Sequence, residues 1–159
     1  MYGSFGVLGF ALLALSCTKE NVKPSGDSLA GMAMNTGGAT QGCSMSQGYW
    51  FASPAAVWPS SGVTVGGHTY TEAEAKAIWN TSNQNGLPDS KKAFTQLVAI
   101  KLSSSTIGAN ASVWSEVSVA ENYLSTLNKL TPSYLPTGDT SASSSAGAIG
   151  VWINNNHCN

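Results

Sequence analysis

The chain has 159 residues, enough for one domain, and a formal net charge of −1 at pH 7. Only 9% of its residues are charged, and all seven basic residues are Lys. Without Arg or a basic cluster the sequence excludes nucleic acid as a partner, because that recognition uses a basic face and the guanidinium fork. Low charge together with many Ser, Thr, Asn and Gly residues favours an extracellular surface.

An apolar run over residues 5–15 precedes the first cysteine. A helix that spans a bilayer needs about 20 apolar residues. The run is therefore too short to span, and it is typical of the apolar core of a secretory signal peptide. We expect residues 1–16 to be that signal peptide. The alternative is a buried N-terminal helix in which Cys17 is a free thiol.

The stretch "LALSC" at residues 13–17 resembles the lipobox of bacterial lipoproteins. In that family a peptidase cuts before the cysteine, whose thiol carries a diacylglycerol, so the resemblance implies a membrane anchor on Cys17. Ala14 stands where the family most often has Leu, and no Lys or Arg precedes the apolar run. "CTKEN" is similar to the signal that sends some lipoproteins to the exterior face of the outer membrane, with Asn21 in place of a second acid.

Three cysteines leave an odd thiol in an exported protein. If Cys17 is acylated, Cys43 and Cys158 remain, and an oxidising compartment predicts a disulfide between them. The alternatives are two unrelated thiols, or a metal ligand beside His157. Residues 17–42 then hold the lipidated cysteine and a flexible linker, in which "DSL" resembles an O-glycosylation motif centred on Ser28.

The folded, extracellular domain is expected over residues 43–159. It opens with "SQGYWFASPAAVWPSSG" at 46–62, where Pro54 and Pro59 forbid a long helix and the aromatic residues predict a packed, irregular segment. Strand-forming residues then flank Gly66-Gly67, which is a two-residue hairpin signal.

Four helices are predicted after the hairpin. Thr71 and Glu74 make a capping box before the first. Gly86 and Pro88 then mark a break, and Asp89 or Ser90 is expected to cap the next helix. The apolar periodicity predicts the remaining helices over 91–102, 113–130 and 143–155.

The predicted fold class is therefore mainly α: a compact small domain of about four helices with one short β-hairpin, its ends closed by the disulfide. In the helix over 113–130, Glu116 and Glu121 fall off the apolar stripe and are expected on a solvated face.

The order of short motifs resembles an extracellular module of the Gly-Tyr-Trp-Lys-Asn-His-Pro type, found in secreted and surface proteins. The matching residues include Gly48-Tyr49-Trp50, Trp58-Pro59 and the "QLVAIKL" stretch at 96–102. The resemblance covers nearly all of residues 43–158 and implies an address and a fold, since the family has no settled activity. Phe51, Ala52 and Ser53 replace its Lys, Asn and His.

No catalytic or metal-binding pattern stands out. The sequence has no Gly-x-Ser-x-Gly elbow, and His68 is expected to be a plain residue beside the turn. Glu72 and Glu74 are explained by their place at a helix start. We therefore expect no enzymatic activity and no cofactor.

The aromatic residues Tyr49, Trp50, Phe51 and Trp58 are the candidate ligand-binding residues, because aromatic faces stack on sugars and anchor protein partners. The alternative is that they belong to the core, as we expect for Trp79, Trp114 and Trp152. The sequence thus predicts a cell-surface lipoprotein with a non-enzymatic binding or structural module that contacts a glycan or a protein. A small secreted hydrolase and an accessory subunit of a surface complex are the alternatives.

Overall fold

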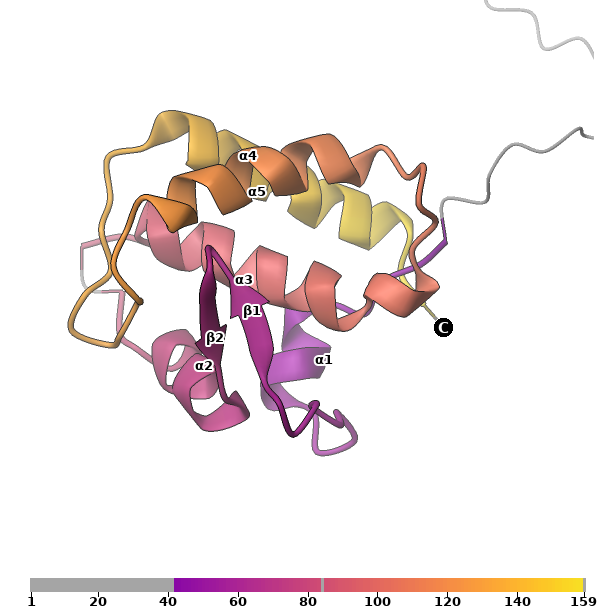
Figure 1. Cartoon of the computed structure of the whole chain (residues 1–159), viewed down its shortest axis with the longest axis horizontal. Helices are drawn as coiled ribbons and strands as arrows, with labels where there is room; N and C mark the ends of the chain where they lie inside the picture. Colours follow the sequence, from indigo (N-terminus) through magenta and orange to yellow (C-terminus); the bar gives the residue numbers. More distant parts are fainter. Residues whose placement is uncertain (1–41, 84, 159) are drawn as a thin grey trace, which may run out of the picture. The chain divides into compact units, whose positions relative to one another are not determined.

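The computed structural model describes residues 42–83 and 85–158. The predicted signal peptide, Cys17, Ser28 and nearly all of the linker lie outside the described residues. Within them the mainly α fold is confirmed (Figure 1). The elements in chain order are α1 (Gln47–Ala52), β1 (Val63–Val65), β2 (His68–Tyr70), α2 (Glu72–Trp79), α3 (Asp89–Leu102), the 3₁₀ turn η1 (Ser104–Thr106), α4 (Val113–Ser125) and α5 (Thr140–Asn155).

Helix α3 is the centre of the domain. It packs against α4 and α5 on one side and against α1, α2 and β1 on the other, as Figure 1 shows. The apolar residues Phe94, Leu97 and Ile100 are fully buried, and each such side chain stabilises the fold by roughly 1.5–3 kcal/mol. Because neighbours cover α3 on several faces, polar side chains in its first half are buried too, including Lys91 at 3% exposure.

The hairpin forms at the predicted place. Val63 pairs with Tyr70 and Val65 pairs with His68, across a turn in which Gly66 and Gly67 have φ values of 57° and 77°. Positive φ at both turn positions matches the twist of a two-residue hairpin.

This turn is held against α4 by Glu121. The Glu121 carboxylate accepts a hydrogen bond from the Gly66 amide at 2.8 Å and pairs with Lys101 of α3 at 2.8 Å. The expectation that Glu121 lies on a solvated face was therefore wrong. Its position off the apolar stripe places it at the edge of α4, where it meets the hairpin.

Two helix starts follow the predictions to different degrees. The capping box of α2 is confirmed, with the Thr71 hydroxyl and the Glu74 carboxylate each bonded to the other residue's backbone amide. The expected side-chain cap of α3 was wrong. Asp89 instead accepts hydrogen bonds from the amides of Gly138 and Asp139, at 2.7 and 3.1 Å, and so holds the loop before α5 against the start of α3.

The aromatic segment differs from the expectation as well. Residues 47–52 of the predicted irregular stretch form the short helix α1, whose N-terminus is capped by the Ser46 hydroxyl accepting from the Tyr49 amide. The helix ends before Pro54, as proline geometry requires. Two further boundaries shift: α4 ends at Ser125 rather than near 130, and α5 begins at Thr140, capped by Asp139.

Candidate functional site

The four aromatic residues predicted to bind a ligand come together in one cluster. Phe51 and Trp58 are buried, at 5% and 9% exposure, whereas Tyr49 and Trp50 are half-buried. The Trp50 and Trp58 rings meet edge to face, at 87° and a centroid distance of 6.4 Å. These two rings therefore do not form a common flat surface on which a sugar could stack.

The polar atoms of this cluster are used within the domain. Trp50 Nε1 donates to Ser103 Oγ at 3.1 Å, and Trp58 Nε1 donates to the Trp50 carbonyl at 2.9 Å. The Tyr49 hydroxyl donates to the Ala55 carbonyl. These contacts attach α1 and the loop after it to the end of α3. The polar atoms of Tyr49, Trp50 and Trp58 therefore have a structural role within the domain.

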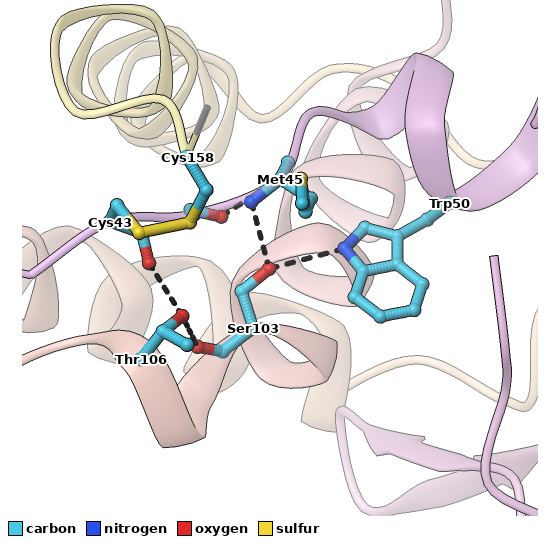
Figure 2. Close-up of a disulfide and its surroundings, with 7 residues drawn as sticks. Cys43, Met45, Trp50, Ser103, Thr106 and Cys158 are labelled. Carbon is cyan, nitrogen blue, oxygen red and sulfur yellow. Dashed lines mark hydrogen bonds between the residues drawn. A yellow bond between two sulfur atoms is a disulfide. The ribbon is translucent and has the colours of Figure 1, made fainter. Parts of the chain in front are cut away.

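The Cys43–Cys158 disulfide is confirmed, with the two Cα atoms 5.0 Å apart (Figure 2). Backbone hydrogen bonds lie beside it: the Ser44 amide donates to the Asn156 carbonyl, and the Cys158 amide donates to the Ser44 carbonyl. Thr106 donates its hydroxyl proton to the Cys43 carbonyl at 2.7 Å. The two ends of the domain are thus joined covalently and by hydrogen bonds, at the C-terminal end of α3.

Sequence reasoning missed a cavity of about 330 Å³ beside the first half of α3. We call it the Trp79 cavity. It is lined by Gln47 of α1, Trp79 of α2, Asn83 and Leu87 of the following loop, and Lys91, Lys92, Thr95 and Gln96 of α3. A larger cavity of about 440 Å³ borders the same loop, but no charged or aromatic side chain lines it. An apolar surface with converging polar groups is the usual composition of a ligand site.

The Trp79 ring is held in place by the core. It stacks on the buried Phe51 ring, with centroids 4.9 Å apart and planes 8° apart. Trp79 packs against the core, as expected, but its side chain is only partly buried. It also lines the cavity.

Two lysine residues line the same cavity. Lys91 Nζ donates to the Thr81 carbonyl at 2.6 Å and to Asn83 Oδ1 at 2.9 Å. Lys92 Nζ donates to the carbonyl of Ser143 at 2.9 Å. Burial lowers the pKa of Lys91, because desolvation disfavours the charged ammonium.

The histidines serve local structure. His68 Nε2 lies 3.2 Å from the Leu127 carbonyl, which links the hairpin to the segment just after α4. The backbone of His157 forms a β-bridge with Ser44 beside the disulfide. Across residues 42–83 and 85–158, no three His, Cys, Asp or Glu side chains gather where they could hold a metal ion. Over that same span, no helix has the length and apolar character to cross a membrane.

Comparison with known protein families, curated proteins and solved structures gives no match for this chain. The resemblances to a lipobox and to the Gly-Tyr-Trp module therefore stay predictions. The site has to be argued from its own residues.

Proposed function

We propose that the chain is a cell-surface lipoprotein whose folded domain is a non-enzymatic binding module, with the Trp79 cavity as its ligand site. The observation that carries the binding role is the composition of this cavity, where a fixed indole ring and two lysines converge. Buried titratable groups in a cavity are a common mark of a functional site.

The disulfide supports export of the domain. Stable disulfides persist in secreted and surface proteins and are rare in reducing compartments. Cys43 and Cys158 are paired, so Cys17 is the cysteine that remains for a lipid. The sequence around Cys17 resembles a lipobox, which supports an acyl anchor on its sulfur.

The placement of the cavity suits a tethered module. The linker reaches the domain at Cys43, whose carbonyl accepts from Thr106 just past the C-terminal end of α3. The lysines of the cavity lie in the first turn of the same helix, about 15 Å away along its axis at 1.5 Å per residue.

Metabolic labelling with an alkyne analogue of palmitate tests the anchor. We expect the wild-type chain to take up the label and Cys17→Ser to lose it. The matched control is the double substitution Cys43→Ser with Cys158→Ser, which should keep the label. No label on the wild type, or equal label on Cys17→Ser, would overturn the lipoprotein proposal.

Protease treatment of intact cells tests the exterior address. A chain on the exterior face should be cleaved in intact cells, whereas a periplasmic control protein should survive until the outer membrane is opened. Protection of the chain alongside that control would place it on the periplasmic side and overturn surface display.

A further inference from the structure

We propose that the Trp79 cavity binds a monosaccharide unit that carries a carboxylate. The inference rests on the binding role proposed above and names the chemical class of its ligand. It depends on four features of the cavity: its charge, its buried lysine, its aromatic surface and its size.

The charged residues that line the Trp79 cavity are both lysines. The described part of the chain contains five lysines, and three of them, Lys76, Lys101 and Lys129, pair with glutamates. The other two, Lys91 and Lys92, have no carboxylate within ion-pair distance among the described residues, and both border the Trp79 cavity. No Asp or Glu lines it. An anionic group bound there would meet lysine side chains and no repelling carboxylate in the lining.

The acids nearest in sequence are engaged elsewhere. Asp89 at the start of α3 accepts from the amides of Gly138 and Asp139, and Asp139 caps α5 by accepting from the Ala142 amide. Neither carboxylate lines the cavity. Asp89 also accepts a hydrogen bond from the Ser143 hydroxyl, which Lys92 Nζ contacts at 3.3 Å, but neither acid forms an ion pair with Lys91 or Lys92.

Lys91 is costly to bury without a counter-charge. Its side chain belongs to a residue only 3% exposed, and its two acceptors, Thr81 O and Asn83 Oδ1, are neutral. A buried ammonium without an anionic partner carries a desolvation cost that a bound carboxylate offsets. The lowered pKa of Lys91, caused by burial, agrees with this uncompensated environment.

The remaining lining suits a sugar ring. An aromatic face carries negative charge density that attracts the weakly positive C–H groups of an apolar ring face, and stacking on Phe51 already holds the Trp79 plane. Gln96 is 9% exposed, and its Oε1 has no hydrogen-bond partner among the described residues. A ligand hydroxyl that reaches this oxygen would supply its missing hydrogen bond.

The size of the cavity limits the ligand. Its volume of about 330 Å³ stands at the small end of the range of roughly 300–1,000 Å³ for small-molecule sites. It therefore suits one sugar unit rather than several.

The test uses the full chain extracted from membranes in mild detergent. Tryptophan fluorescence and calorimetric titrations compare D-glucuronate, D-galacturonate and N-acetylneuraminate with D-glucose, D-galactose and acetate. We expect at least one acidic sugar to bind ten or more times more tightly than its neutral counterpart and more tightly than acetate, and to weaken when sodium chloride rises from 50 to 500 mM.

Matched variants assign the binding to the cavity. Lys92→Gln should weaken acidic-sugar binding by tenfold or more, whereas Lys92→Arg, which keeps the charge, and Lys76→Gln, which lies outside the cavity, should stay within twofold of the wild type. Circular dichroism confirms that each variant is folded, and the salt titration tests the charge in the wild type alone.

Three results would overturn the inference: no binding of any acidic sugar, equal affinity for acidic and neutral sugars, or binding that Lys92→Gln leaves unchanged. Acetate binding as tightly as the sugars would show a plain anion site and overturn it equally. None of these results alters the palmitate labelling, so failure of the ligand assignment and failure of the lipoprotein proposal can be told apart.

Discussion

The disulfide offers the sharpest test of how this small domain is stabilised. Replacing both Cys43 and Cys158 by Ser removes the covalent link and leaves the neighbouring backbone hydrogen bonds of Ser44 available. The two cysteines are 115 residues apart in sequence. In the chain-entropy description, opening a loop of that length destabilises the fold by about 4.8 kcal/mol at 25 °C, through the freedom that the unfolded chain regains.

Urea unfolding followed by tryptophan fluorescence measures this loss. Typical domains have a total stability of about 5–15 kcal/mol, so the double variant should lose a large share of it. With a slope near 1.5 kcal/mol per molar urea, the midpoint should fall by about 3 M. Wild-type chain reduced with dithiothreitol is the control, because it opens the same loop without a substitution and should unfold at the midpoint of the double variant.

The result that would refute this reasoning is a midpoint shift below about 0.5 M in both the reduced and the substituted chain. Such a shift would mean that the disulfide does not restrict the unfolded ensemble, and that other contacts already hold the ends together. A large shift in the double variant without one in the reduced wild type would instead trace the loss to the new Ser side chains.

Two further substitutions test other contacts. Gly66→Ala should lower the free energy of unfolding by about 1–3 kcal/mol, because its Cβ would lie 2.6 Å from Leu124 Cβ. Gly67→Ala is the control: this residue also has a positive φ, but an added Cβ would meet nothing within 4 Å, so the loss should be smaller. Equal losses of stability in thermal unfolding would rule out the close approach to Leu124 as the cause. Hydrogen bonds led by that from the Gly138 amide lower the pKa of Asp89. Its stabilisation is therefore complete above the ordinary carboxyl pKa of about 3.9 and is lost as pH falls through the lowered value. Asp89→Asn should be less stable than wild type at pH 7 and converge with it in acid, and a constant gap at every pH would contradict this.

Local patterns predicted most of the secondary structure. The hairpin depends on Gly66-Gly67 between strand-forming residues, and the start of α2 depends on a capping box, so residues within a few positions of each other decide both. The disulfide followed from the odd number of cysteines rather than from geometry. The helix α1 was missed because its six residues are too few to show a period, and tertiary contacts stabilise it.

The roles of Asp89 and Glu121 could not be predicted from local patterns. Asp89 has the sequence context of a helix cap and Glu121 that of a solvated residue, yet each accepts hydrogen bonds from a segment distant in sequence. A side chain chooses among competing donors by their distance in the folded state, and that distance is set by how the helices pack.

Helix packing likewise decides which features of this protein its sequence predicts and which it does not. The sequence alone predicted the hairpin, the four helices after it and the pairing of Cys43 with Cys158, and it carries the resemblance to an exported, lipid-anchored chain. Only the tertiary structure distinguished Lys91 and Lys92 from the paired lysines, and only it brought Trp79 to the same cavity. Residues of α1, α2 and α3 line this cavity because the packing of these helices buries polar residues of α3. The order of residues in the sequence does not show which polar residues become buried.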